Sequence, residues 1–495
     1  MRMLKGKILE EYEVNAHGEI AKIQIVEISP FHKVYVVNLP AFGKATMKVL
    51  DEIKTKILHQ LTISPKEFLD PKARTKIKAI LESTAKQIFE NVGFRTEESN
   101  FLIARLLNEM LGLGDLEVLL ADENLEEIAV NNSHEKIWVY HKIYGWLETT
   151  LKLSSEDEIF NLANNIGRKV GKQITTLNPL MDAYLYTGDR VNATLAPISQ
   201  KGNTITIRKF ARKPWTITQF IALKTISSEV AALIWEAVQY ELNIMVTGGT
   251  GSGKTSFLNV MAPFIQPNHR IISIEDTREL NLPERLHWIP LVTRTATPEG
   301  KGEVSMLDLM INSLRMRPDR LFVGEIRRHQ EAEVLFEAMH TGHSVYSTVH
   351  AENADQLKRR LTTPPISISE ELLESLHLIV VQYRHRRLGI RRTYEVAEIV
   401  PSGMQAGKVT MDVRTLYKWK AKEDVIVKDK DSLRLFDELM LVAGFTPSEL
   451  KQDLSEKKAI LDFMVKSKIF DLNNVCEMIS LYYASPEEVL KKVRR

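Results

Sequence analysis

VTGGTGSGKTSF, at residues 246–257, places four glycines and a lysine in one short window. It contains the complete pattern Gly-x-x-x-x-Gly-Lys-Thr. Glycines have no Cβ, so successive backbone N–H groups can turn onto a polyphosphate, and a following helix N-terminus adds partial positive charge. We expect Lys254 to bind the β and γ phosphates of ATP and Thr255 to offer a hydroxyl to Mg²⁺. The residues predicted to hold the nucleotide are Gly248, Gly249, Thr250, Gly251, Ser252, Gly253, Lys254, Thr255 and Ser256.

The surroundings of this loop fit a P-loop, because apolar residues occupy 242 and 244–246 before it and recur at helical spacing after it. From 217 to about 400, apolar strands alternate with amphipathic helices. This alternation predicts a mainly parallel sheet covered on both faces, in an α/β fold with a RecA-like P-loop core. The strands expected there are 242–246, 270–275, 319–324 and 343–349.

The rest of the chain is expected to form separate parts, with the segment ARKPWT at 211–216 as the best linker candidate. An α+β domain should precede the core, and the tail should begin with a strand and end in helices. The predicted division is an N-terminal accessory region at 1–95, the α+β domain at 96–213, the P-loop domain at 214–400 and a C-terminal hairpin and helical region at 401–495.

Composition excludes several classes of protein. The 495 residues carry a net charge of only +2, which gives no general attraction to nucleic acid or anionic lipid. Cys476 is the single cysteine, so an intramolecular disulfide framework and a cysteine-rich zinc module are excluded. The N-terminal stretch is charged and no apolar run approaches the ~20 residues of a membrane helix, so we expect a cytoplasmic protein.

Acidic residues end two of the predicted strands. Glu325 closes LFVGE, and Glu275, Asp276 and Glu279 follow in ISIEDTRE. Ligands of open α/β sheets bind at the carboxyl ends of the strands. We therefore expect Glu325, Glu275 and Asp276 to organise Mg²⁺, partly through water, and Glu325 with Glu279 and Glu275 to support hydrolysis.

Three histidines lie close together in the sequence, at 340, 343 and 350. Their spacing matches no closed zinc site, and cysteine ligands are missing. His343 and His350 are expected at opposite ends of one strand, where an imidazole would sense the γ phosphate or an adjacent subunit. The alternative is that each is a buried, satisfied core histidine.

Four motifs in this order resemble the ring-forming ATPases of type II and type IV secretion, type IV pili and the archaellum. They are the P-loop GGTGSGKT, the aspartate box IISIEDTREL, the glycine-glutamate strand RPDRLFVGE and the histidine box TGHSVYSTVHAEN. The segment from TRTATPEG to VGEIR is most similar to the tight-adherence pilus and archaeal branch. The resemblance, over roughly residues 100–400, implies a hexameric ATPase that uses MgATP. It also implies a peripheral position at the membrane, through a polytopic platform protein.

The same resemblance extends into the preceding domain. DAYLYTGDRVNATLAPIS and NTITIRKF are similar to the family segments from which an arginine reaches the γ phosphate bound by a neighbouring subunit. The matching positions are Arg190 and Arg208, with Arg212 as a weaker candidate. A cation supplied there would stabilise the charge of the phosphoryl-transfer transition state. The alternative is that these are surface arginines at strand ends.

Two other classes of function remain open. A nucleic-acid translocase or helicase would find a phosphate footprint in the arginine-rich YRHRRLGIRR at 383–392. That stretch also reads as a β-hairpin with a Leu-Gly turn, at the surface or at a subunit contact. A small-molecule kinase would need an acceptor pocket, for which the sequence offers no candidate. The bacterial type II branch carries a four-cysteine zinc insertion, which one cysteine excludes.

Overall fold

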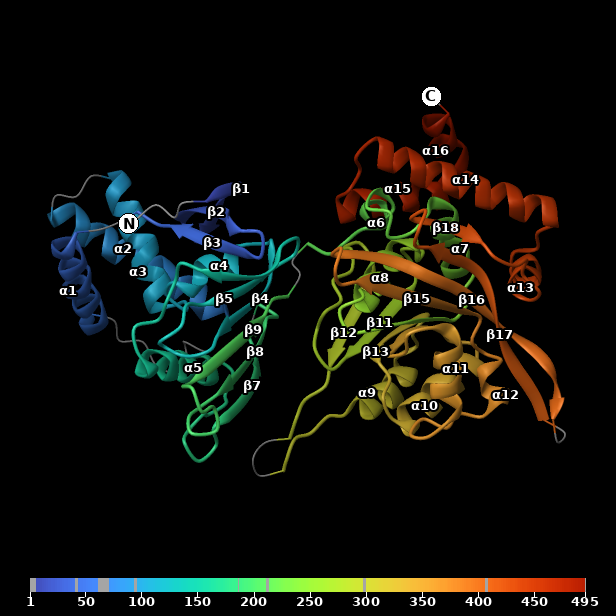
Figure 1. Ribbon diagram of the computed structural model, residues 1–495, viewed down its shortest axis with the longest axis horizontal. Helices are drawn as coiled ribbons and strands as arrows, with labels where there is room; N and C mark the ends of the chain where they lie inside the picture. Colours follow the sequence, from blue (N-terminus) through green and yellow to red (C-terminus); the bar gives the residue numbers. More distant parts are fainter. Residues whose placement is uncertain are drawn as a thin grey trace. The chain divides into compact units, whose positions relative to one another are not determined.

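The computed structural model describes residues 6–40, 43–60, 71–92, 96–185, 187–210, 213–296, 300–405 and 408–494. The chain forms two compact units, Met1–Ala211 and Arg212–Arg495, drawn in Figure 1. The linker candidate 211–216 contains this boundary, and its first two residues, including Arg212, lie outside the described residues. The four-part division of the chain stays a prediction. No helix in the described ranges is long and apolar enough to cross a bilayer.

The first unit is built on one sheet, with the strand order β1-β2-β3-β6-β5-β4-β9-β8-β7. Its neighbouring strands are antiparallel except for β3 and β6, which pair in parallel through Val34 with Glu148 and Tyr35 with Thr149. The strands are β1 Lys7–Ala16, β2 Glu19–Ser29, β3 His32–Asn38, β4 Leu125–Val130, β5 Trp138–His141, β6 Gly145–Thr149, β7 Leu180–Tyr184, β8 Arg190–Thr194 and β9 Thr204–Arg208. The helices are α1 Lys44–Gln60, α2 Pro71–Val92, α3 Thr96–Met110, α4 Leu116–Ala121 and α5 Glu156–Lys169.

Strand alternation decides which side chains of β8 and β9 face outward. Ile205 and Ile207 of β9 are fully buried, and Val191 of β8 is buried with them. Successive side chains of a strand point to opposite faces. Arg190 and Arg208 therefore lie on the face of the sheet that is turned away from this core.

The second unit is built on a mixed sheet with the order β12-β11-β13-β14-β10-β15-β16-β17-β18. The strands from β12 to β15 are parallel, and β16 to β18 continue antiparallel. The strands are β10 Ile244–Gly248, β11 Arg270–Glu275, β12 His287–Val292, β13 Arg320–Glu325, β14 Ser344–Val349, β15 Leu378–His385, β16 Ile390–Gln405, β17 Lys408–Lys420 and β18 Val425–Lys428. The four strands expected from the alternating pattern are thus β10, β11, β13 and β14.

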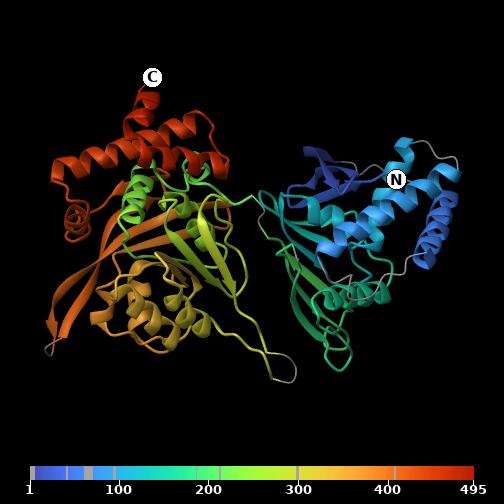
Figure 2. The same cartoon turned by 180° about the vertical axis from the view of Figure 1, so that it is seen from behind.

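Helices cover both faces of this sheet, as Figure 2 shows from behind. The side chains of β10 divide between the faces: Ile244 and Val246 enter one apolar cluster, and Met245 enters the other. The helices are α6 Ile217–Ala222, α7 Ser228–Gln239, α8 Lys254–Met261, α9 Met306–Ser313, α10 His329–His340, α11 Ala354–Thr362, α12 Glu370–Leu373, α13 Leu435–Ala443, α14 Pro447–Lys466, α15 Leu472–Ala484 and α16 Pro486–Val493, with short 3₁₀ turns η2 Ala262–Phe264 and η3 Leu314–Met316. The predicted α/β P-loop core, preceding α+β unit and helical C-terminal region are confirmed.

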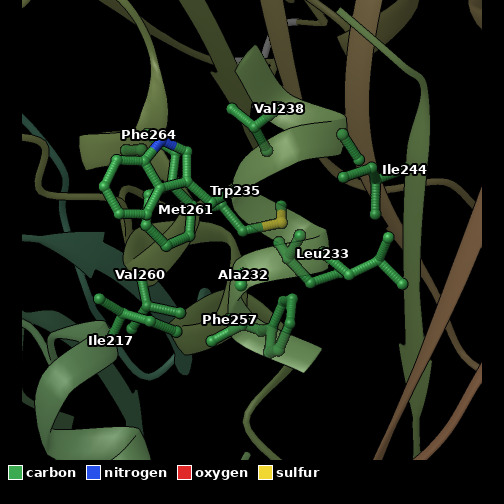
Figure 3. Close-up of a cluster of buried hydrophobic side chains, with 14 of the residues drawn as sticks. Ile217, Ala232, Leu233, Trp235, Val238, Ile244, Phe257, Val260, Met261 and Phe264 are labelled. Carbon is green, nitrogen blue, oxygen red and sulfur yellow. The ribbon is translucent and has the colours of Figure 1, made fainter. Parts of the chain in front are cut away.

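The C-terminal helices pack against the helices that flank the P-loop. Trp235 of α7 stacks on Phe264, which follows α8 (Figure 3). Its Nε1 donates a hydrogen bond to Tyr483 of α15 at 2.7 Å. Lys457 of α14 is fully buried and forms ion pairs with Glu236 of α7 and with Asp453, the latter at 2.6 Å. A buried charge needs partners of this kind. The tail of the chain is therefore part of the P-loop core.

Candidate functional site

The P-loop connects β10 to α8 and needs glycine at defined positions. Gly251 has φ 70° and Gly253, at the N-cap of α8, has φ 100°, both in the left-handed region. A Cβ on Gly248 would lie 2.1 Å from the carbonyl oxygen of Gln382. The loop is therefore a backbone cradle that side chains at these positions would fill or strain.

Lys254 begins α8 and its side chain turns back over the loop. Its Nζ donates hydrogen bonds to the carbonyl oxygens of Gly248 at 3.1 Å and Gly249 at 3.3 Å. Burial lowers the pKa of Lys254, and the nearby carboxylates of Glu325 and Glu279 oppose that shift. Both acidic strand ends predicted from the sequence thus act electrostatically on the P-loop lysine.

Glu325 ends β13, next to β11 in the sheet, and is paired with an arginine. Arg327 Nη2 donates to the Glu325 carboxylate at 2.7 Å, and Arg327 Nη1 donates to Asp276 at 3.3 Å. Burial raises the pKa of Glu325, but Arg327, Lys254 and His350 outweigh it and hold that pKa below its ordinary value. Glu325 is therefore an ionised group beside the P-loop lysine.

Glu275 ends β11 and is almost fully buried. One carboxylate oxygen accepts hydrogen bonds from the backbone N–H groups of Glu279 at 2.9 Å and Leu280 at 3.0 Å. The other has no hydrogen-bond partner among the described residues. Burial raises the pKa of Glu275 to about 7 in spite of those two donors. Asn259 of α8 donates to the Glu279 carbonyl at 3.4 Å, so this turn is tied to the P-loop helix.

The two histidines of the histidine box lie at opposite ends of β14. His350 follows the carboxyl end of the strand, and its charge contributes to lowering the pKa of Glu325. His343 precedes the strand, with its Nδ1 3.3 Å from the Ala338 carbonyl at the end of α10. The fold brings His350 to the edge of the sheet that carries the P-loop and does not bring His343 there. In the described ranges, no group of three His, Cys, Asp or Glu side chains is arranged to hold a metal.

Arg190 and Arg208 are direct partners on the neighbouring strands β8 and β9 of the first unit. Directly opposed residues of an antiparallel pair share one face, so both arginines project from the same face of the sheet. Asp182 of β7 accepts two hydrogen bonds from Arg190, at 2.9 and 2.6 Å. Arg208 lies close enough to Glu127 to oppose the pKa increase that burial causes there.

Comparison with known proteins gives the same assignment as the motifs. Residues 120–421 match the model of the type II/IV secretion system protein family. The chain belongs to this family. An uncharacterized protein of Methanocaldococcus jannaschii, MJ0900, is 35% identical over 78% of this chain and 70% of its own length. The type IV secretion system protein PtlH of Bordetella pertussis is 31% identical over 55% of this chain and 89% of its own.

Solved structures of lower identity also align with this family member. The ATPase DotB of Legionella pneumophila is 21% identical, with a TM-score of 0.40, over 75% of this chain and 92% of its own. The pilus retraction motor PilT with bound ADP is 17% identical, with a TM-score of 0.41, over 74% of this chain and 93% of its own.

The donor set of the family member fits a nucleotide and a divalent cation. The glycine cradle offers backbone N–H groups, Lys254 offers a cation, and the oxygen ligands that Mg²⁺ prefers are available from Thr255 and the carboxylates. Ser252 Oγ and one Glu275 carboxylate oxygen are buried polar atoms without a hydrogen-bond partner in the described part of the chain. Unpaired buried polar atoms are costly, so a ligand at this edge would satisfy them.

Sequence reasoning missed Arg327 and Asp182, which bind the predicted site residues Glu325 and Arg190. Arg327 lies two positions after Glu325 in a strand-like run, and period-two alternation would have placed both side chains on one side. Asp182 lies eight residues before Arg190, and only the pairing of β7 with β8 brings them together. A hairpin signal between these strands was available in the turn residues TGD at 187–189.

Proposed function

We propose that this secretion-family protein hydrolyses MgATP and works as a ring-forming motor. It would drive assembly of a type IV pilus-like filament, or protein secretion, through a polytopic membrane platform protein that holds it at the inner face of the membrane. The observation that carries the proposal is the meeting of Lys254, Glu325 and the buried Glu275 at one edge of a parallel sheet, on a glycine cradle.

The roles of the residues follow from their chemistry. Lys254 and the loop N–H groups would bind the phosphates, and Thr255, Glu275, Asp276 and Glu325 would hold Mg²⁺, partly through water. When bound, Mg²⁺ neutralises charge on the phosphates. Glu325 and Glu279 would orient the attacking water, and His350 lies at the same edge of the sheet as Glu325. For Glu325 to act as a base, its pair with Arg327 has to loosen, since a carboxylate bonded to a guanidinium is a poor proton acceptor.

A shared site explains why the predicted arginines lie in the other unit. We assign Arg190 and Arg208 to the γ phosphate bound by a neighbouring copy of the chain, and His343 to a subunit contact. Support comes from the pairing of the two arginines on the outward face of their sheet. Asp182 binds the Arg190 guanidinium through two hydrogen bonds, so a phosphate would have to compete with this carboxylate for Arg190.

The decisive experiment mixes two inactive variants. Lys254→Ala subunits keep their arginines, and Arg190→Ala subunits keep their P-loops, so some interfaces of a mixed ring contain an intact site. We expect each variant alone to lose ATPase activity and the mixture to regain part of it, with the rate per subunit rising with protein concentration. Full activity of Lys254→Ala would refute the ATP site. Inactive mixtures, once subunit exchange is demonstrated, would refute the shared site alone.

A nucleic-acid translocase gains no support from the arginine-rich hairpin. Arg392 is buried and bonded to both carboxylate oxygens of Asp424, at 2.7 and 2.9 Å. Arg391 donates to a P-loop carbonyl. Arg391 and Arg392 thus already bind groups within the chain, which leaves them poorly placed to form a phosphate-binding face for nucleic acid.

A further inference from the structure

The hairpin of β15 and β16 is held rigidly beside the P-loop. β15 lies next to β10 in the sheet, with Gln382 opposite Gly248. On β16, Arg392 is 6% exposed and its guanidinium forms the bidentate pair with Asp424, whose pKa it lowers to about 2. Arg392 also donates to the Leu223 carbonyl at 3.2 Å. The backbone at Arg391 is therefore held by the pairing of β16 with β15 and by the contacts of the adjacent Arg392.

Arg391 comes from this anchored strand and reaches the apex of the loop. Its Nε donates a hydrogen bond to the carbonyl oxygen of Gly251 at 3.0 Å. Its Cδ would lie 3.6 Å from a Cβ on Gly253. Arg384, its direct partner on β15, is as close, because a Cβ on Gly251 would meet its Nη1 at 2.8 Å. Two arginine side chains thus lie against the loop at Gly251 and Gly253.

Gly251 is a part of the cradle that benefits from such a restraint. Its φ of 70° is open to glycine, which also populates many other conformations at little cost. A loop that samples those conformations has to be ordered when phosphate binds, and this ordering reduces affinity. A hydrogen bond from a charged donor to the Gly251 carbonyl fixes the peptide before the ligand arrives.

We infer that Arg391 is a positioning residue for nucleotide binding, which acts through the Gly251 peptide and preorganises the P-loop. The inference rests on the proposed ATP site and adds to it a residue from a strand that carries none of the four motifs. Arg391 acts on the ground state: it sets how tightly the diphosphate part of ADP or ATP is held, and it leaves the chemical step unchanged.

The test compares Arg391→Ala with Arg387→Gln, since Arg387 lies at the exposed hairpin turn and serves as the control for charge. We expect Arg391→Ala to weaken MgADP and a non-hydrolysable MgATP analogue by the same factor, on the order of tenfold. The KM for ATP should rise with kcat retained, and Arg391→Lys should restore part of the affinity. Amide exchange at 248–255 without nucleotide should become faster in Arg391→Ala and stay unchanged in Arg387→Gln.

The other outcomes contradict the inference, and they distinguish its failure from the failure of the proposed ATP site. A loss confined to the ATP analogue would make Arg391 a γ-phosphate ligand and overturn the role through Gly251. Unchanged affinity and exchange in Arg391→Ala, with binding lost in Lys254→Ala, would refute the inference and leave the ATP site standing. Normal binding by Lys254→Ala would refute both. A circular dichroism spectrum matching the parent protein controls for unfolding.

Discussion

At the scale of single residues, the proposed role of Glu325 in orienting water requires an ionised carboxylate near Lys254 that does not form an ion pair with it. Its partner Arg327 bridges to Asp276, so the carboxylates of two neighbouring strands share one cation. Removing the charge of Glu325 should leave the cradle and the lysine intact, because neither is held in place by the Glu325 side chain.

We therefore predict that Glu325→Gln still binds nucleotide but hydrolyses ATP about a hundredfold or more slowly. A group that orients water contributes mainly to the transition state. Single-turnover hydrolysis and the Kd for MgADP measure the two effects separately. Glu337→Gln, on the exposed side of α10, is the matched control. A parallel loss of affinity and rate would show that Glu325 is a binding or folding residue.

The sequence predicted those residues of the candidate site that lie close to the P-loop or to a strand end in the sequence itself. The P-loop, Glu325 and Glu275 stand next to their own strand ends, so pattern and fold class sufficed to bring them together. Arg391 was not predictable as a P-loop contact, because its position depends on β15 inserting beside β10, more than 100 residues away in sequence. His343 and His350 were expected at opposite ends of one strand, and the structure has them on either side of β14.

At the scale of elements, some helix N-termini are capped by neighbouring residues in the sequence and others by residues far away in the sequence. Thr446 caps α14 within its own sequence, as its spacing to Glu449 suggests. The carboxylate of Glu398 on β16 instead supplies the bonds for the start of α13, accepting from Leu433 N at 2.7 Å and Leu435 N at 2.8 Å. The sequence around α13 does not predict that Glu398, 35 residues before Leu433, accepts these hydrogen bonds.

His377, just before β15, joins that strand to β10 and gives the sheet a pH dependence. Its Nδ1 accepts a hydrogen bond from Asn243 N at 2.9 Å, so the ring is neutral with the proton on Nε2, 3.3 Å from Glu438. Burial, with Arg434, lowers the pKa of His377 to about 4. The unfolded chain takes up this proton near pH 6.5, before the folded one does.

The predicted consequence is a loss of stability as pH falls from about 6.5 toward 4. The free energy of unfolding should decrease by up to about 3 kcal/mol over that window through this residue alone. His377→Asn, which cannot become charged, should show a shallower decrease when urea midpoints are measured from pH 8 to pH 4.5. Equal slopes for the two proteins would contradict the assignment. His287→Asn, at an exposed position of β12, controls for a general histidine effect.

At the scale of the whole molecule, the core of the second unit contains a fully buried lysine, Lys457. Lys457 is surrounded by Glu236, Asp453 and the rings of Trp235 and Tyr240. Removing one partner of such a group leaves uncompensated charge in a low-dielectric interior, which costs more than the intact arrangement contributes.

We predict that Lys457→Met destabilises the protein by about 3–5 kcal/mol. The neighbouring exposed Lys458→Met should change stability by less than about 0.5 kcal/mol. Adding Glu236→Gln to Lys457→Met should recover part of the loss, because it removes one of the stranded charges. Chemical denaturation of the three variants measures these effects, and a Lys457→Met protein as stable as its parent would exclude the buried ion pairs as a determinant of the fold.

The packing of α14 and α15 on α7 also has a consequence for how the protein is made. Trp235 and its hydrogen-bond partner Tyr483 are 248 residues apart, so a ribosome producing about 5–20 residues per second exposes the apolar side of α7 for on the order of ten seconds or more before its cover exists. The P-loop strand and helix emerge during that interval. The second unit therefore completes its core only after its last helices have been synthesised, and the nascent chain offers a long-lived binding site to chaperones until then.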